Sequence, residues 1–348
     1  MTLKTLIAER LQNGMPLVEH PYRAIAAEFG CQEATVLALT NELTREGYIR
    51  SWGAFVDFER LGYERLLCGL AVPEGRVASV TSLLSERPEV TRGDLRGHSI
   101  NVWLMVLLKK TTDPEGKELT ERARFIEQIL GACECPFVVL STEVRLKLRS
   151  SFHFSRDFSR DEYSEPTFEE SVPDVITEED ILIDETLTAL ILNEETRSIL
   201  GLLQRSFPIV SEPFELTARK VERSVPQLLK RLRNLEEARI LRKIGASLHH
   251  RRMGYNVNTL VAWVINNEDI IDVAKRAASF PWVSHCYIRK VVENTLHHPW
   301  LYSLYTILHA PNESSLIEQL RVMKDSLLTR DMITMPMVRE LKKARYLL

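Results

Sequence analysis

The chain has 348 residues, 45% of them hydrophobic and 27% charged, with a formal net charge of −3. This composition is typical of a soluble globular protein with two to four domains. It excludes a membrane protein, because no apolar run reaches the roughly 18–20 residues that a spanning helix needs. The first ten residues also lack the apolar core of a signal peptide, so we expect no export.

The cysteines indicate the redox compartment. Five cysteines occur without regular spacing, a pattern typical of free thiols in a reducing cytoplasm. Cys133 and Cys135 stand close together, but no second Cys/His pair follows at the spacing of a zinc site. We therefore expect a cytoplasmic protein without a structural metal.

Residues 1–56 predict a winged helix-turn-helix domain. The periodicity indicates helices over 3–11, 21–30 and 32–46, followed by a strand that ends at Gly53. Residues 57–150 predict a ferredoxin-like domain with the order βαββαβ. Its strands are expected at 66–72, 90–96, 101–108 and 137–148, and its helices at 77–84 and 118–130.

An acidic connector follows at residues 151–190. Residues 151–186 hold twelve acidic residues against two arginines, a net charge of −10, so the rest of the chain carries +7. Two prolines also interrupt this segment. These features predict an exposed linker between two halves.

The second half repeats the first. Residues 11–63 and 203–255 align at a constant offset of 192 without a gap. Matching pairs include Leu11/Leu203, Pro16/Pro208, Arg50/Arg242, Gly53/Gly245 and Tyr63/Tyr255. This period is far too long for a solenoid, whose units span about 20–50 residues. It indicates a duplicated and fused two-domain protein.

The repeat predicts a second winged helix at residues 191–248 and a second ferredoxin-like domain at 249–348. The latter's strands are expected at 259–265, 283–289, 302–309 and 338–347, and its helices at 269–278 and 315–327. The fold class is therefore α+β, a tandem duplication. Helices cover one face of each antiparallel sheet, so the other face needs a partner. We expect the two sheets to face each other, with a ligand in the cleft between them.

The winged helices are poorly suited to DNA. The first candidate recognition helix, within residues 32–42, has two acidic residues and no basic one, and would repel phosphate. The second has Lys230, Arg231 and Arg233, but they lie in its C-terminal half, whereas base-reading residues cluster near the N-terminus. We expect these domains to serve as a scaffold and DNA to be an unlikely partner.

Several segments resemble a known family. They are residues 242–251, 261–263, 284–289, 302–310 and 339–343 in the second half, and 15–22 and 96–103 in the first. The layout is similar to that of the Lrp/AsnC regulators. The segments themselves more closely resemble the siroheme decarboxylases of heme d1 and alternative heme biosynthesis, and the resemblance covers nearly the whole chain outside the connector.

The resemblance implies a heterodimer made covalent, with siroheme bound between its ferredoxin-like domains. The implied reaction removes CO₂ from two acetate side chains and gives didecarboxysiroheme. It needs no organic cofactor, because the conjugated ring can hold the electrons, and the iron tetrapyrrole is the substrate. Other heme-pathway enzymes are implied as partners, the fused chain could form a homodimer, and no membrane is involved.

The chemistry needs a proton donor and cations. Histidine suits the donor at neutral pH, and the candidates are His285, which could also contact the substrate iron, and His98. Arginine suits the remaining carboxylates. The candidates for substrate binding are Arg96, Arg289, Arg145, Lys147, Lys342 and His250, with Trp103 and Tyr305 packing on the macrocycle or in the core. Arg145 and Lys147 would share one face of a strand with period two.

The first half departs from the family pattern beside the expected site. The family reads His-x-Tyr-x-Arg-x-His here, whereas this chain has Arg92, Asp94, Arg96 and His98 at those positions. A non-catalytic tetrapyrrole-binding regulator and an Lrp/AsnC-type transcription factor therefore stay as alternative functions. In either case the second half carries the fuller set of site residues.

Overall fold

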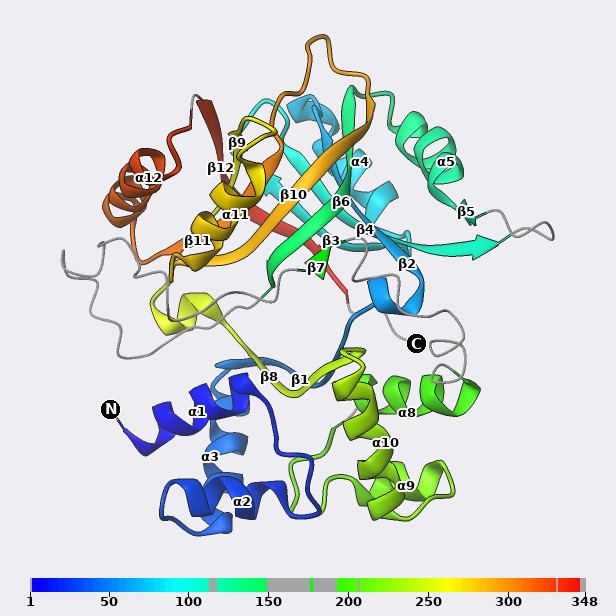
Figure 1. Cartoon of the computed structure of the whole chain (residues 1–348), viewed down its shortest axis with the longest axis vertical. Helices are drawn as coiled ribbons and strands as arrows, with labels where there is room; N and C mark the ends of the chain where they lie inside the picture. The colour runs from blue at the N-terminus through cyan, green and yellow to red at the C-terminus, as the bar shows by residue number, and fades with distance from the viewer. Residues whose placement is uncertain are drawn as a thin grey trace.

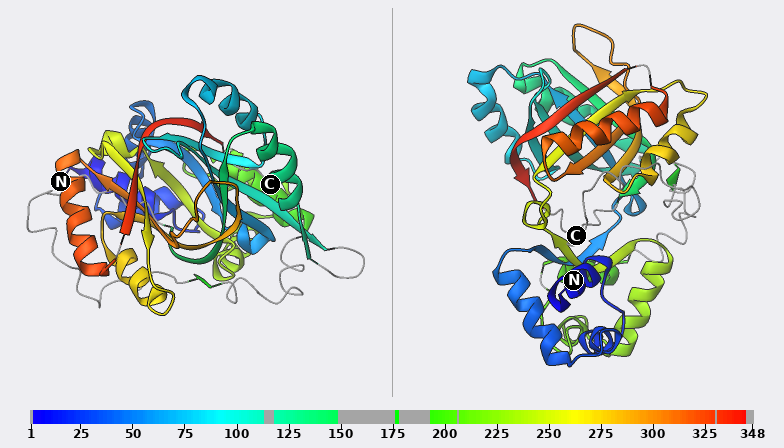
Figure 2. Two further views of the ribbon diagram at one scale, coloured as in Figure 1. Left: turned by 90° about the horizontal axis from the view of Figure 1, so that it is seen from above. Right: turned by 90° about the vertical axis from the view of Figure 1, so that its left-hand side faces the viewer.

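The computed structural model describes residues 2–112, 118–148, 176–177, 193–205, 207–329 and 331–344. The predicted acidic connector at 151–190 lies outside the described residues, except for the short strand β7 (Ile176–Thr177), which pairs with β6. The chain forms two layers, a pair of winged helices below and a large β-structure above (Figures 1 and 2).

The two winged helices share one hydrophobic core, to which both halves contribute. The first consists of α1 (Leu3–Asn13), α2 (Pro21–Glu28), α3 (Glu33–Arg45) and β1 (Ile49–Val56). The second consists of α8 (Glu194–Arg205), α9 (Glu215–Lys220), α10 (Val225–Glu237) and β8 (Leu241–Leu248). Ser224 begins α10 with a full capping box, which fixes the start of that helix.

The wing strands β1 and β8 pair antiparallel, with Gly53 opposite Gly245. These two glycines are equivalent in the repeat, so the approximate two-fold axis of the duplication passes between them. A Cβ atom on Gly245 would lie 2.6 Å from the carbonyl oxygen of Leu11. Glycine at this position is therefore required by the close approach of α1.

The first ferredoxin-like domain has the sheet order β6-β2-β4-β3. Its strands are β2 (Tyr63–Leu70), β3 (Val90–Arg96), β4 (Val102–Thr112) and β6 (Phe137–Leu148), and its helices are α4 (Val77–Ser85) and α5 (Arg122–Arg124), which continues as a π-helical stretch (Phe125–Leu130). The helix expected at 118–130 begins late, because β5 (Glu118–Thr120) pairs with the extended end of β4.

The second ferredoxin-like domain has the equivalent order β12-β9-β11-β10. Its strands are β9 (Val257–Val264), β10 (Val283–Asn294), β11 (Leu304–Ala310) and β12 (Asp331–Lys343), and its helices are α11 (Ile270–Ser279) and α12 (Glu313–Leu327). Both orders are that of the predicted ferredoxin-like fold. The expected strand 338–347 starts earlier, at Asp331.

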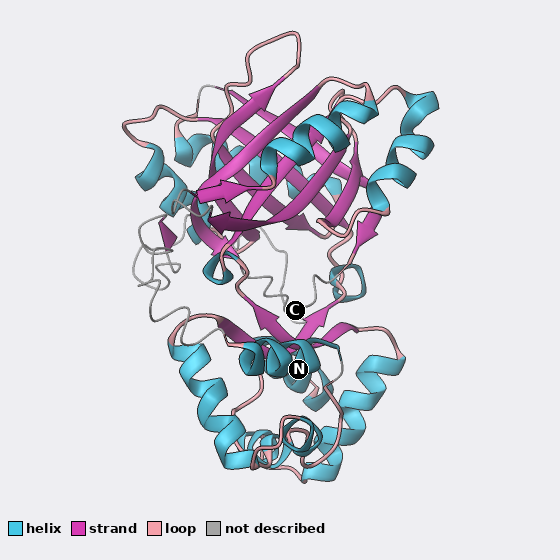
Figure 3. Cartoon of the chain, turned by 90° about the vertical axis from the view of Figure 1, so that its right-hand side faces the viewer, coloured by secondary structure: helices cyan, strands magenta, loops and turns pink. Residues whose placement is uncertain are grey.

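The two sheets join at both edges into a closed barrel (Figure 3). The last strand of each half crosses into the other half, since β6 pairs with β10 and β12 pairs with β3. Pro336 marks the point where β12 leaves β9 for β3. The expected facing of the two sheets is present, but edge pairing replaces an open cleft between separate sheets.

The interior of the barrel has two different ends. One end is filled by apolar side chains from both halves, including Leu67, Trp103, Leu140, Leu260 and Tyr305. The other end faces the winged helices and is lined by charged and polar side chains. The helices pack on the outer faces of the strands, over two further apolar cores.

Candidate active site

The polar end of the barrel is built from alternating positions of two equivalent strands. Arg92, Asp94 and Arg96 alternate on β3, and His285, Tyr287 and Arg289 alternate on β10. Because strand side chains alternate between faces, each set shares one face. The two sets are related by the duplication at an offset of 193, so the approximate two-fold axis brings them to the same end of the barrel.

The segment after the first wing delivers two acids to this end. Arg145 of β6 donates to Asp57, and its second nitrogen donates to Glu59 at 2.5 Å. All three side chains are buried. Burial alone would raise the pKa of Asp57, but the hydrogen bond and charge of Arg145 lower it. Arg65 of β2 adds an ion pair to Glu59 at 3.6 Å.

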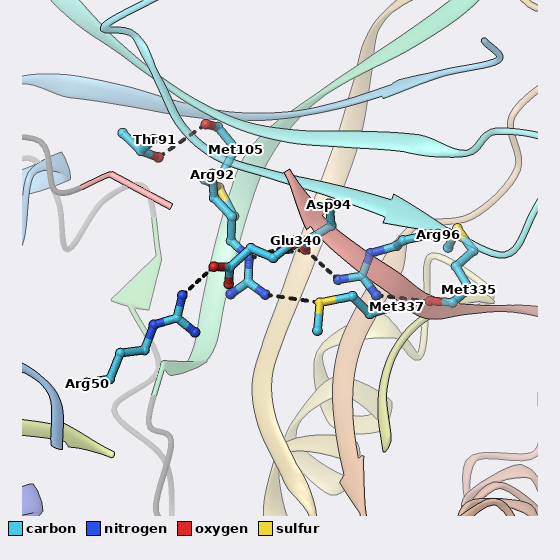
Figure 4. A network of polar contacts seen from close by, with 9 residues as sticks. All are labelled: Arg50, Thr91, Arg92, Asp94, Arg96, Met105, Met335, Met337 and Glu340. Carbon is cyan, nitrogen blue, oxygen red and sulfur yellow. Dashed lines mark hydrogen bonds and ion pairs between the residues drawn. The ribbon is translucent and has the colours of Figure 1, made fainter. Parts of the chain in front are cut away.

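A second ion-pair network lies on β3 and β12 (Figure 4). Asp94 accepts from Arg92 Nε at 3.1 Å and from Arg96 at 2.8 Å, and Arg96 also donates to the carbonyl of Met335 at 2.9 Å. Arg50 from the wing strand β1 donates to Glu340 of β12. The network therefore ties both halves and the winged helices to this end of the barrel.

Arg289 is fixed by its neighbours on β6 and β10. It donates to the hydroxyl of Thr142 at 2.9 Å, and its guanidinium lies 4.5 Å from the ring centroid of Tyr287. Thr142 in turn donates to the backbone carbonyl of Arg65 at 3.3 Å. One threonine thus links the side chain of Arg289 to the strand that carries Arg65.

Three histidines reach the same end. His285 receives or donates a 2.8 Å hydrogen bond with Ser284, and the rings of His250 and His309 lie 5.1 Å apart. Burial, then the charge of Arg92, lowers the pKa of His285 to about 3. Burial, then His249, lowers the pKa of His250 to about 4. Burial, then His250, lowers the pKa of His309 well below its ordinary value. All three are therefore neutral at neutral pH.

The structure brings five of the predicted residues together, places two more at the border of this group and puts the other three elsewhere. Arg96, Arg145, His250, His285 and Arg289 share the polar end. Trp103 and Tyr305 belong to the apolar cluster but border the polar end, because they pair with Asp94 and Tyr287 across the strands. Trp103 donates to the carbonyl of Ile100, and the hydroxyl of Tyr305 accepts from Trp300.

His98 lies at the apolar end as well. It follows β3, directly before β4, and accepts from the backbone N–H of Ile100 at 3.1 Å. Leu70 pairs with both Val102 and Phe137, so the start of β4 lies at the start of β6. His285 instead pairs with Leu148 at the end of β6. The two predicted catalytic histidines are therefore at opposite ends of the barrel.

Two predicted lysines point away from the polar end. A register shift between the pairs Cys286–Lys147 and Tyr287–Arg145 separates Lys147 from Arg145, so the expected shared face is absent. Lys147 donates to the carbonyls of Ala278 and Phe280 at the end of α11. Lys342 donates to the carbonyl of Arg87 at 2.6 Å. Both act on backbone carbonyls outside the barrel.

Several residues of this end were not predicted, namely Asp57, Glu59, Arg65, Tyr287 and His309. The duplication offers a signal for two of them, because Asp57 and Glu59 are equivalent to His249 and Arg251, which follow the second wing. Tyr287 could have been found because it lies two residues after His285, and His309 because it lies four residues after Tyr305, so that each pair shares one face of a strand.

The charges at this end are unbalanced toward the positive. Arg65, Arg92, Arg96, Arg145 and Arg289 share it with the three carboxylates of Asp57, Asp94 and Glu59. The charges of Arg242 and Lys343 act on the same end. Neutral histidines add proton acceptors. Such an arrangement can bind a polyanion and, once anionic charge has entered, supply a proton.

Among the described residues, no group of three or more His, Cys, Asp or Glu side chains is placed so that it could hold a metal ion. The thiol of Cys135 contacts the carbonyl of Cys133 at 3.1 Å, and both cysteines are buried. None of the described helices has the length and apolarity to cross a bilayer.

Two family models match the chain. The siroheme decarboxylase NirDL-like HTH domain matches residues 4–50 and 196–242, and the AsnC-like ligand binding domain matches residues 252–342. The first match coincides with the two winged helices. The repeat of one model at two positions agrees with the duplication.

Curated relatives extend this likeness. A siroheme decarboxylase of Hydrogenobacter thermophilus is 27% identical over 89% of this chain and 84% of its own length. The siroheme decarboxylase NirG subunit of Stutzerimonas stutzeri is 35% identical over 44% of this chain and 94% of its own length. One relative thus matches almost end to end, and a separate subunit matches about half.

A solved structure shares the fold. The crystal structure of the siroheme decarboxylase NirDL superimposes with a TM-score of 0.65, covering 97% of this chain and 92% of that chain at 23% identity. The relatives, the repeated HTH model and the common architecture agree. The chain belongs to the siroheme decarboxylase family.

Proposed function

We propose that this protein decarboxylates siroheme, removing CO₂ from two acetate side chains to give didecarboxysiroheme. The observation that carries the proposal is the polar end of the barrel, where arginines outnumber carboxylates beside three neutral histidines. Siroheme carries eight carboxylates, so a surplus of guanidinium groups matches its charge. The family of the chain supplies the substrate class.

In the proposed reaction, the bond between an acetate CH₂ carbon and its carboxylate breaks and releases CO₂. The electron pair stays on the carbon and spreads into the conjugated ring. A proton from His285 then forms the new C–H bond and leaves a methyl group. Arg96 and Arg289 bind carboxylates that stay, which holds the ring during the transfer.

His285 must acquire the proton that it delivers. In the ligand-free chain burial, and then the charges of Arg92, Arg242 and Arg65, lower the pKa of His285 and keep the ring neutral. A bound polycarboxylate places negative charge beside those arginines and favours the imidazolium, since opposite charges stabilise the protonated form. Substrate binding therefore favours protonation of the donor, and each of the two decarboxylations takes one proton from solvent.

The setting and partners remain part of the proposal. All five cysteines are free thiols, which suits a reducing cytoplasm. Other heme-pathway enzymes that supply siroheme or consume its product are the expected partners, and a homodimer of the fused chain is the expected assembly. No organic cofactor is required by the proposed chemistry.

The test is anaerobic incubation of the protein with siroheme, followed by mass spectrometry. We expect products lighter by one and then two CO₂. If the protein binds siroheme and the mass of siroheme is unchanged after prolonged incubation, the proposal is contradicted.

A tetrapyrrole-binding regulator without turnover is the second candidate, and one observation favours it. Arg92 and Asp94 stand where the family has histidine and tyrosine, and both are engaged in the network of Figure 4. This candidate predicts a shifted Soret band on adding siroheme and no change of mass.

Transcription-factor function has less support. Glu33, at the start of the first recognition helix α3, accepts from Ser211 of the other winged helix at 2.7 Å. Arg233 of α10 donates to the carbonyl of Leu17 at 2.9 Å. Groups that a DNA reader would turn toward the groove are used to join the two winged helices.

A further inference from the structure

Several buried donors at the polar end lack hydrogen-bond partners in the described residues. Three of them lie close together, namely the hydroxyl of Tyr287, the Nε of Arg289 and the Nε of Arg65, whose nearest carboxylate, that of Glu59, is 3.6 Å away. Tyr287 is 4% exposed and Arg289 is 3% exposed. A buried polar group without a partner is destabilising, so three close together need an explanation.

These donors come together from both halves of the chain. Arg65 lies on β2 of the first half, while Tyr287 and Arg289 lie on β10 of the second. Strand β6 runs between them, and its Thr142 contacts both arginine positions. The guanidinium of Arg289 lies over the ring of Tyr287 at 4.5 Å, which fixes the ring near both cations.

The surrounding charge favours an anion. The charges of Arg65, Arg145 and Arg289 lie in this neighbourhood, together with the carboxylates of Asp57 and Glu59. Arg145 is satisfied by those two acids. Arg65 also faces Glu59, at 3.6 Å, so three arginines share two carboxylates and one net positive charge remains next to the unpaired phenol of Tyr287. A carboxylate is the group that accepts from all three donor types at once.

We propose that Tyr287, Arg289 and Arg65 form a subsite that binds one carboxylate side chain of the tetrapyrrole. This inference rests on the proposed function and assigns to Tyr287 and Arg65 a binding role. The carboxylate accepts one hydrogen bond from the phenol and one from each guanidinium. No bond is broken at this subsite, so it orients the ring while His285 acts at a different side chain.

Loss of the Tyr287 hydroxyl should affect stability and ligand binding differently. In the ligand-free protein the hydroxyl of Tyr287 is a cost, so Tyr287→Phe should leave the thermal midpoint unchanged or raise it. The ring and its stacking on Arg289 are kept. In the complex the hydroxyl donates to a charged acceptor, so its loss should weaken binding of iron uroporphyrin III at least about tenfold.

A matched control exists in the winged helices. The hydroxyl of Tyr22 is also buried without a partner, and its ring lies in the shared core. Tyr22→Phe should show the same unchanged or raised midpoint, with an unaltered dissociation constant for iron uroporphyrin III. Both variants remove one buried hydroxyl, so a change in affinity that occurs only in Tyr287→Phe comes from the position of that hydroxyl.

The measurement is a Soret titration of the full chain and both variants with iron uroporphyrin III, alongside thermal unfolding. Equal dissociation constants for wild type and Tyr287→Phe would overturn the subsite, as would a large fall of the midpoint in that variant. If the wild type binds the porphyrin but leaves siroheme unchanged in mass, the proposed turnover fails while the subsite stands.

Discussion

Arg92 on β3 and His285 on β10 occupy equivalent positions in the two halves, and Arg92 is the strongest charge acting on His285. After burial, it contributes most to holding the pKa of His285 at about 3. Arg92 itself is held by Asp94 at 3.1 Å. The duplication has thus placed a fixed cation at the position equivalent to that of a titratable base.

Replacing Arg92 should make His285 easier to protonate. In Arg92→Gln the cation is lost, so the pKa of His285 should rise toward its ordinary value. NMR titration of the histidine ring in the ligand-free protein measures this directly. Arg321→Gln, on the exposed helix α12, is the control and should leave that pKa unchanged. An unaltered His285 titration in Arg92→Gln would contradict the relationship.

Stability should fall in mild acid because of the neutral histidines. His250 has a pKa of about 4 in the folded chain and about 6.5 when unfolded. Between those values the unfolded state binds the proton first, so the free energy of unfolding falls as pH falls and is fully present above pH ~6.5. The expected loss is on the order of 1–3 kcal/mol by pH ~4.

The variant His250→Gln removes one such proton site. Urea unfolding between pH ~7 and ~4 should therefore show a shallower decline than in the wild type. Identical slopes for the two proteins would show that His250 is not held neutral by its surroundings.

Arg145 should be a main support of the barrel end. Arg145→Met leaves Asp57 and Glu59 buried without their principal cation, which should lower the free energy of unfolding by about 3–5 kcal/mol. Adding Asp57→Asn and Glu59→Gln should recover much of the loss. Arg321→Met, which breaks only exposed pairs, should change it by less than about 0.5 kcal/mol. A loss for Arg145→Met no larger than the control's would refute this role.

Lys147 should matter for stability and not for turnover. Its ammonium group caps the carbonyl end of α11, so Lys147→Met should cost about 0.5–1.5 kcal/mol. The kcat/KM for siroheme should stay within error of the wild type under conditions where both are folded. A fall in turnover at unchanged stability would contradict this role and would support the substrate-binding role predicted from the sequence.

The sequence allowed the repeat, both domain types and the positions of the strands to be predicted, because each depends on local periodicity and on the constant offset, whereas most strand bounds differ by several residues. Strand β6 was predicted at its observed bounds, 137–148. The first part of β12 was missed, since Pro336 interrupts its pattern. The structure explains that proline, because β12 changes its partner strand there.

The closure of the barrel and its buried ion pairs could not be predicted from local sequence patterns. The pairing of β6 with β10 joins residues about 140–160 positions apart, and no periodicity encodes it. A single register shift turned Lys147 to the outside of the barrel, against the simple alternation expected from sequence. Asp57 and Glu59 meet Arg145 only because the first wing leads directly into the barrel.

The central claim is that chemistry takes place at the wing-facing end of the barrel, around His285, and not at the apolar end around His98. Single-turnover decarboxylation of siroheme by His285→Ala and His98→Ala, followed by mass spectrometry, tests it most directly. We expect His285→Ala to bind siroheme yet release CO₂ at least about a hundredfold more slowly, and His98→Ala to keep a near wild-type rate. Loss of turnover in His98→Ala, with a normal rate in His285→Ala, would contradict the account.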